Sequence, residues 1–440
     1  MPFLVERDTP ITVKLIGSII NQFKTTQLPI LNKMYNYYNG KQAIMTKPAP
    51  ADWKPYNRIV TNQCKYIVDS YNGYLTGIDI TYSSDEDIDE IQNILNYNDV
   101  STEDSLLLRN ALIFGKSFEI MYIDEDGKQR FRTLDPRDCI DVYYNDLEQE
   151  LACVIRWYAV NNIDISPEYI VEVYTDSETT IYRSDSSLSS FLLVEAKPNF
   201  YGQVPINVMK LNEEEKSIFE PIMGLQDAYN TLLSSSVDDW EAFCDAYLVL
   251  AGFDTDEETV KTMKQNRVLV IPEGGHAEYL IKDVNTQQVQ NLLDLMDEKI
   301  HTISNCPNFA DPEKFGAASG ISLKYKLLGF ENAASNIVKN MTKTLQRRIE
   351  LICHIINMVG GDDAWRDIQI IFTRNLPMDS AEIVNEINGL RGLVSTKTLI
   401  SQLPFITDID AEMEALQEEK QQNIDLYGFN IDREVEEDEE

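Results

Sequence analysis

The chain has 440 residues, a hydrophobic fraction of 43% and a formal net charge of −35 at pH 7. This length and composition predict a globular protein of about two to four domains. The acidic balance disfavours sequence-specific nucleic-acid binding, which needs Lys and Arg on phosphates, and binding to an anionic membrane surface. It is compatible with an acidic channel wall that lets DNA slide past without gripping it.

The sequence carries no pattern typical of a membrane span, a signal peptide or a metal site. No apolar run reaches the roughly eighteen residues of a membrane span, and residues 1–9 lack the features of a signal peptide. The six cysteines are scattered without a CxxC pair, and there are three histidines. We therefore expect reduced thiols of an intracellular protein, no metal, no cofactor and no membrane association.

The first quarter of the chain has helical periodicity, interrupted by a proline-rich connector at 47–55 and an alternating strand at 78–82. The predicted helices lie at 10–45 (with a break near Gln27), 57–77, 86–97 and 101–114.

From Lys116 to about Val208 the apolar period changes to two, which predicts a β-rich meander. The candidate strands are 117–123, 129–133, 139–143, 151–159, 169–174, 178–183 and 191–196. Asp124–Gly127 is interpreted as a hairpin turn, because it lacks the later ligands of a calcium loop.

Gly115-Lys116-Ser117 resembles the end of a phosphate-binding loop, but Asn110 replaces the required earlier glycine. The order is also helix then strand, whereas a phosphate loop needs strand then helix. We interpret Gly115 as the glycine that ends a helix before a strand.

The second half predicts two helices, 221–247 and 286–304, around a small mixed unit at 248–283. The loop at 306–320 contains two prolines, two glycines and two phenylalanines, and a loop this long between helices is usually functional or disordered. A strand is predicted at 367–374. Further helices are predicted at 379–391, 395–402 and 408–426, before an acid-rich last decapeptide, 431–440.

A long helix is predicted from Ser319 to Met358, with a bend at Gly329. Its apolar stripe consists of Leu323, Leu327, Phe330, Ala334, Ile337, Met341, Leu345, Ile352 and Ile356. A rod of about 60 Å exceeds a small domain, so we expect other copies of the chain to bury part of it. Opposite the stripe lie Lys339, Lys343 and Arg347, which form either a solvated face or a contact with a polyanion or an acidic neighbouring subunit.

Candidates for catalysis are few, and we predict that the protein is not an enzyme. Asp238-Asp239 with Glu241, or Glu213–Glu215, could pair carboxylates for acid–base work, but solvated helix faces are the default in so acidic a chain. His276 is interpreted as a turn residue, and His301 and His354 as packed or surface residues. Nucleophile-elbow, zinc-helix and dinucleotide motifs are missing from the sequence.

Several short segments, in this order along the chain, resemble the portal (connector) proteins of tailed bacteriophages, in the branch of long-tailed phages that infect Gram-positive hosts. They are Tyr37–Gly40, Asn57–Val60, Lys65–Asp69, Gly73–Gly77, Asn110–Glu119, Leu134–Asp138 before Val142–Tyr144, Asp227–Asn230 with Asp245–Leu248, and Ala318–Lys326. The resemblance covers about residues 30 to 425.

The resemblance implies an α+β multidomain, ring-forming portal-type fold with a β-rich wing, a helical stem, a small αβ clip, a long helix and a helical crown. The implied ranges are the wing 1–218 with its strand 359–377, the stem helices 219–247 and 286–304, the clip 248–285, the tunnel loop 305–320, the long helix 321–358, the crown 378–427 and the acidic tail 428–440.

The resemblance also implies a role and partners. Such proteins form a ring, typically a dodecamer, at one capsid vertex of the virion, after assembly in the host cytoplasm. The ring passes double-stranded DNA non-specifically during packaging and ejection, and it contacts the terminase large subunit, the head–tail adaptor, and the major capsid and scaffolding proteins. The DNA-facing loop would present Phe309, Asp311, Glu313, Lys314 and Phe315. The clip would present Asp254, Asp256, Glu257 and Glu258 to terminase and then adaptor.

Two other readings stay open on the residues alone. One is a monomeric acidic hydrolase that uses paired carboxylates. The other is a non-viral scaffold or adaptor that binds its partners through the long helix. The mass of the particle in solution and an image along its axis separate the three readings.

Overall fold

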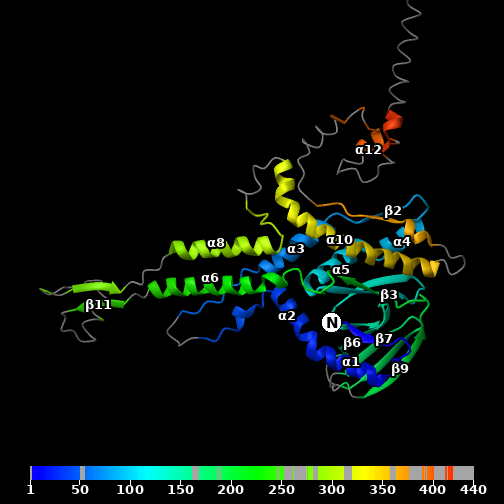
Figure 1. Cartoon of the computed structure of the whole chain (residues 1–440), viewed down its shortest axis with the longest axis horizontal. Coiled ribbons are helices and arrows are strands. Elements are labelled where there is room, and N and C mark those ends of the chain that lie inside the picture. The colour runs from blue at the N-terminus through cyan, green and yellow to red at the C-terminus, as the bar shows by residue number, and fades with distance from the viewer. Residues whose placement is uncertain are drawn as a thin grey trace, which may run out of the picture. The chain divides into compact units, whose positions relative to one another are not determined.

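The computed structural model forms two compact units, Met1–Asn375 and Leu376–Glu440, of which the first contains most of the described elements (Figure 1). The residues that the structure describes are 2–49, 55–160, 168–185, 188, 190–244, 247–251, 261, 274, 276–280, 286–311, 320–356, 363–375, 389–390, 392, 394–400, 412–413 and 415–419.

The first unit begins with helices that the sequence largely predicts. They are α1 (Val13–Thr26), α2 (Leu28–Tyr38), η1 (Ala43–Thr46), α3 (Gln63–Thr76), α4 (Asp89–Tyr97) and α5 (Val100–Phe114), with the short strands β1 (Phe3–Val5) and β2 (Thr81–Ser83). Pro29 lies in the first turn of α2, where its missing N–H costs nothing, so the chain breaks at Gln27 as expected. The helix predicted at 57–77 begins only at Gln63, which corrects its start by six residues.

Two sheets follow. Their strands are β3 (Lys116–Ile123), β4 (Gln129–Leu134), β5 (Cys139–Tyr144), β6 (Leu151–Val160), β7 (Glu168–Tyr174), β8 (Glu178–Ser184), β9 (Phe191–Pro198) and β10 (Ile206–Lys210). The six-stranded sheet has the order β1-β5-β6-β7-β8-β9, and the smaller sheet has the order β10-β3-β4. Strands β5 to β9 pair antiparallel with their chain neighbours, which confirms the predicted meander. β1 and β10 were missed, because each is short and pairs with a strand that is distant in the sequence.

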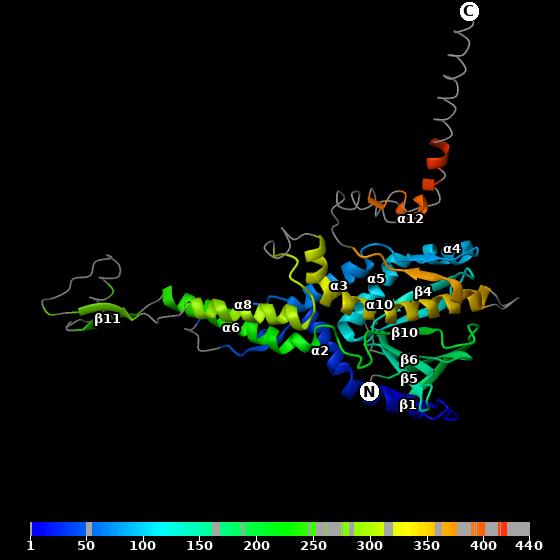
Figure 2. The same ribbon diagram turned by 45° about the horizontal axis from the view of Figure 1, so that its top comes forward.

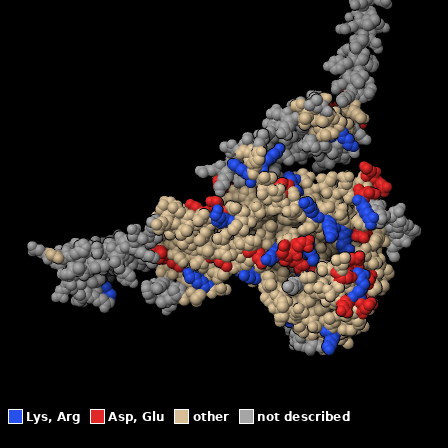
Figure 3. Space-filling model, viewed as in Figure 1, with Lys and Arg blue, Asp and Glu red and all other residues tan. Residues whose placement is uncertain are grey.

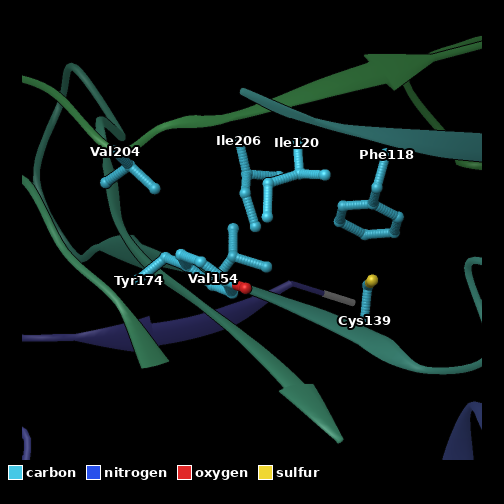
Figure 4. Packing of buried hydrophobic residues seen from close by; sticks show 7 residues of the cluster. All are labelled: Phe118, Ile120, Cys139, Val154, Tyr174, Val204 and Ile206. Atoms are coloured by element: carbon cyan, nitrogen blue, oxygen red, sulfur yellow. The ribbon is translucent and has the colours of Figure 1, made fainter. Parts of the chain in front are cut away.

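The two sheets enclose an apolar core (Figure 4). It contains residues of both sheets and of the segment before β10, namely Phe118, Ile120, Cys139, Val154, Tyr174, Val204 and Ile206. Full burial of a large apolar side chain contributes about 1.5–3 kcal/mol, so this layer holds the sheets together.

The hairpin and glycine predictions are confirmed. Asp124–Gly127 connects β3 to β4, and Gly127 has a φ of +76°. Gly115 ends α5 with a φ of +84°, and a Cβ there would lie 2.1 Å from the Glu215 carbonyl oxygen. Any side chain at this position would therefore clash with the backbone, which explains the glycine without a phosphate site.

The long helix is α10 (Gly320–Ile356), and both ribbon views show it bent in its N-terminal part, as expected from Gly329 (Figures 1 and 2). Most of the predicted stripe is buried, at Leu327, Phe330, Ala334, Ile337, Met341, Leu345 and Ile352. The chain's own elements provide this burial, since α10 packs on β10, α3, α4 and η3 (Asp363–Asp367). The expectation that other copies must bury the helix is wrong for this stripe.

Helices α6 (Met223–Cys244) and α8 (Thr286–Ile303) lie side by side (Figures 1 and 2). β11 (Tyr247–Ala251) and β12 (His276–Leu280) pair antiparallel, so His276 begins a strand rather than forming a turn. β13 (Gln369–Ile371) pairs with β2. In the second unit, α12 (Thr396–Ile400) falls within the helix predicted at 395–402, and residues 415–419 are helical. The helix predicted at 379–391 lies almost wholly outside the described residues, as does most of the mixed unit predicted at 248–283.

Candidate functional site

The first part of the predicted DNA-facing loop, here called its root (residues 304–309), is fixed to helix α3 by two tyrosine hydroxyls. The Tyr66 hydroxyl accepts the Phe309 N–H at 2.8 Å and donates to the Pro307 carbonyl at 3.2 Å. The Tyr71 hydroxyl donates to the Ser304 carbonyl at 3.0 Å. The backbone from Ser304 to Phe309 is therefore held in place on α3.

His301 fixes the same root from the last turn of α8. Its Nδ1 lies 2.8 Å from the Cys306 carbonyl oxygen, which assigns the proton to Nδ1 in the neutral ring. Its ring packs edge-on against Tyr66, with centroids 5.8 Å apart. Asn305, which directly precedes Cys306, has a φ of +51°, so the chain turns directly after the helix. His301 is thus a packed residue, as the sequence predicts.

Phe309 lies at the root and not at the tip of the loop. Its ring packs edge-on on Phe330 of α10 with centroids 5.5 Å apart, although 38% of the residue stays exposed. Asp311 is partly exposed. The other predicted loop residues, Glu313, Lys314 and Phe315, and the clip residues Asp254, Asp256, Glu257 and Glu258 lie outside the described residues.

A hollow of about 400 Å³ opens beside this root. Glu298, His301, Thr302, Asn305, Pro307, Asn308, Lys326, Gly329 and Phe330 line it. A Cβ on Gly329 would lie 3.2 Å from the Asn305 Oδ1 atom, so glycine permits the close approach of α10 to the end of α8.

The predicted basic stripe of α10 divides in two. Lys339 and Lys343 are exposed, as expected for a solvated or partner-binding face. Arg347 differs, because its guanidinium donates to the Gln203 Oε1 atom at 2.7 Å and to the Val204 carbonyl at 3.3 Å. Burial lowers the pKa of this guanidinium. Arg347 therefore ties α10 to the segment before β10 and is no part of an open surface.

Sequence reasoning missed a fully buried charge at the next residue, Arg348. The Arg348 side chain is fully buried and binds Asp104 of α5 at 2.6 Å and Glu119 of β3 at 2.6 Å. It also donates to the Tyr82 hydroxyl at 3.2 Å. Burial alone would lower the pKa of Arg348, but the two carboxylates raise it by more than burial lowers it, so the guanidinium stays charged. The only sequence signal was an Arg at the edge of the apolar stripe of α10.

A second buried ion cluster joins the two sheets. Lys116, the first residue of β3, binds Asp141 of β5 at 2.6 Å and Glu215 at 3.2 Å. Lys210 of β10 binds the same Glu215 at 2.9 Å. The lysine that resembled a phosphate-loop residue is thus a structural cation between the layers.

A strap at residues 57–63 runs along α6 and is attached by its backbone. The N–H groups of Asn57, Ile59, Thr61 and Gln63 donate to Asp238 (2.7 Å), Ser234 (2.9 Å), Asn230 (3.2 Å) and Gln226 (3.0 Å), in that order. Two extended residues advance about 6.6 Å and four helical residues about 6 Å. Alternate strap residues therefore meet every fourth residue of α6.

The carboxylates considered for acid–base work have structural partners. Asp238 and Glu241 both accept from the Asn57 amide, and Glu215 binds Lys116 and Lys210. No group of three or more His, Cys, Asp or Glu side chains is placed to hold a metal ion in the part of the chain that is described. None of the described helices is long and apolar enough to cross a membrane.

The outer faces of α6 and α8 expose large apolar side chains. Trp240 is 61% exposed, and Leu295 and Leu292 are 48% and 47% exposed. Tyr325 and Leu328, near the start of α10, are also exposed. On the face shown in Figure 3, acidic and basic groups lie close together over the sheets and α10. The helix pair α6–α8 thus carries large apolar side chains that are exposed in a single chain.

The helices, sheets and loop follow one another in the order expected of a portal-type protein of tailed phages, a class of structural proteins. The family model described as phage portal protein, SPP1 Gp6-like, matches residues 18–426. The chain belongs to this phage portal protein family.

Two portal proteins are similar to nearly the whole chain. The portal protein of Bacillus phage SPP1 is 22% identical over 433 residues, which cover 92% of this chain and 84% of the relative. The portal protein of Clostridium phage phiCD119 is 22% identical over 437 residues, which cover 92% of this chain and 95% of the relative.

Proposed function

We propose that twelve copies of this portal-family chain form a closed ring at one capsid vertex, through which double-stranded DNA passes during packaging and ejection. The carrying observation is the α6–α8 pair with Trp240, Leu292 and Leu295 exposed. Identical chains around an axis would bury these side chains in a closed heterologous interface. Each would contribute about 1–2 kcal/mol, because only about half of its surface is still free to bury.

The parts of the chain receive the following roles. Residues 1–218 with 359–377 form the wing, and α6 with α8 forms the stem. Residues 248–285 form the clip, and 378–427 form the crown. The clip, with its acids at 254 and 256–258, contacts the terminase large subunit and later the head–tail adaptor. The wing and crown contact the major capsid and scaffolding proteins, and the particle is assembled in the host cytoplasm.

The loop at 305–320 narrows the channel and contacts the DNA backbone non-specifically. Its tethered root supports this role, because the chain is fixed by Tyr66 at Phe309 and continues as helix α10 from Gly320. The strongly negative chain prevents tight adhesion by repelling phosphates. Where the loop meets DNA, its one basic residue, Lys314, would supply short-lived contacts.

The ring is tested on purified protein. Light scattering is expected to give a particle many times the chain mass of 50.4 kDa, and negative-stain images are expected to show a central hole. Trp240→Glu puts a charge into the proposed interface and should yield smaller species. Leu193→Glu is the matched control, since Leu193 is 56% exposed on β9, away from the stem. A monomer at high concentration, or equal effects of both variants, contradicts the ring.

The loop is tested by replacing residues 312–318 with Gly/Ser of equal length, which leaves Tyr66 and Phe309 in place. Rings should form normally, while DNA packaged per head should fall sharply, because the charged and aromatic contacts are gone. A variant with the same residues in scrambled order keeps charge and length, so non-specific contact predicts near-normal packaging. Unchanged packaging in the Gly/Ser variant overturns the role of the loop.

A further inference from the structure

The Tyr66 hydroxyl makes two hydrogen bonds to the loop backbone. It receives the N–H of Phe309 and gives its proton to the carbonyl of Pro307, so it spans Asn308 from both sides. Proline has no N–H, and Asn308 lies between the two bonded groups. One side chain of α3 therefore fixes the backbone at the last residues before the chain leaves the root.

The tyrosine is itself held firmly. Its neighbours Cys64, Ile67 and Val68 on α3 are buried, which places the helix in the core. Its ring packs edge-on against His301 at the end of α8. Burial raises the pKa of the Tyr66 hydroxyl, only partly offset by the Phe309 N–H. The group therefore keeps its proton and remains a donor at neutral pH.

The space beside the root would let its backbone take other positions if the Tyr66 bonds were lost. The hollow of about 400 Å³ lies beside Asn305, Pro307 and Asn308, and Asn305 is exposed with a left-handed backbone. Without the Tyr66 bonds, the segment from Asn305 to Phe309 would lose two of its attachments to α3 and α8. Each freed residue adds up to about 3.5 Å of contour length to the loop.

We propose that Tyr66 is a positioning residue for the DNA-facing loop, whose hydroxyl fixes the loop backbone on both sides of Asn308. This inference rests on the proposed role of the loop. With the two bonds made, the backbone at Pro307 and Phe309 is ordered before the loop contacts DNA, so the contact costs little additional ordering at these residues. With the bonds lost, these residues must be ordered each time the loop contacts DNA.

The test is Tyr66→Phe in the assembled ring, which removes the hydroxyl and keeps the ring packing on His301. Hydrogen–deuterium exchange of the Phe309 amide should quicken about five- to tenfold, the effect of losing one hydrogen bond. Tyr38→Phe is the matched control, because the Tyr38 hydroxyl binds Asp69 at the surface of the same helix. Its exchange at 305–311 should equal that of the wild type.

A functional readout accompanies the exchange measurement. Tyr66→Phe rings should keep their melting temperature within a few degrees, yet retain less packaged DNA than the wild type and Tyr38→Phe. If hydrogen exchange at the Phe309 amide is unchanged, the positioning role of Tyr66 is disproved, even where the Gly/Ser loop variant still fails to package DNA. If exchange quickens and both Tyr66→Phe and the Gly/Ser variant package normally, the proposed role of the loop fails and the positioning role with it. If exchange quickens and Tyr66→Phe packages DNA normally while the Gly/Ser variant does not, the loop contacts DNA without needing the Tyr66 bonds, and the inference is overturned.

Discussion

Arg348→Met is expected to lower the free energy of unfolding by about 3–5 kcal/mol. The side chain is 0% exposed and neutralises two carboxylates, Asp104 and Glu119, which are 2% and 0% exposed. Methionine keeps much of the packing on Phe131 but leaves both acids buried without a cation. The melting temperature of the purified protein and its urea midpoint give the measurement.

The pH dependence of this variant follows from Asp104. Burial raises the pKa of Asp104 to about 6, and Arg348 acts against that shift. Removing Arg348 lifts the pKa further, so protonation stabilises the variant at low pH and this gain disappears as pH rises through the folded pKa. The deficit relative to the wild type should therefore widen between about pH 5 and pH 8.

Controls for Arg348 come from the same helix and the same cluster. Lys343→Met, on the exposed face of α10, should cost less than about 0.5 kcal/mol. Adding Asp104→Asn and Glu119→Gln to Arg348→Met should restore part of the loss, because neutral amides tolerate burial better than carboxylates. A loss as small as that of Lys343→Met would show that the cluster contributes no stability.

Lys116→Met should cost about 3 kcal/mol. The ammonium is 4% exposed, and its loss leaves the buried Asp141 carboxylate with no cation within the 4 Å of an ion pair among the described residues. Burial pushes the pKa of Asp141 up, but Lys116 outweighs burial and holds it below its usual value. In the wild type, this carboxylate adds stability above about pH 4 that is lost as pH falls further.

The variant should reverse that pH trend. Without the ammonium, burial raises the pKa of Asp141, so the gap between variant and wild type shrinks as pH falls toward 4. Adding Asp141→Asn should recover stability at pH 7, while Asp141→Asn alone should be destabilising, since Lys116 then keeps only Glu215. Lys197→Met, in an exposed pair with Glu195, is the control. A gap that is constant with pH would assign the loss to packing alone.

Local chemistry predicted much of the fold from the sequence. The period of two in the sequence located β3 to β9, several of which contribute side chains to one core, and Gly115 was recognised from the order of helix and strand. β10 and the strap were missed for a common reason. Their place depends on partners far along the chain, β3 for one and α6 for the other.

The site was less predictable than the fold. Lys339, Lys343 and Arg347 have the same spacing, yet Arg347 donates to the Val204 main-chain carbonyl whereas the two lysines are exposed. Neighbouring positions one step around a helix, such as 347 and 348, differ in burial through the elements that pack on them. The role of Tyr66 depends on a contact 243 residues away, which no local pattern encodes.

In the series of main-chain hydrogen bonds between the strap and α6, the side chains that specify the attachment lie on the helix and not on the strap. Its donors are main-chain amides, which every residue type except proline supplies, whereas its acceptors are four particular side chains of the helix. The strap can therefore vary in sequence at positions other than Asn57 and Thr61, whose side chains also bond to α6, provided that proline stays off the alternate positions, while α6 must keep its four acceptor side chains. Related chains should thus preserve the helix half of this pairing more faithfully than the half that lies on it.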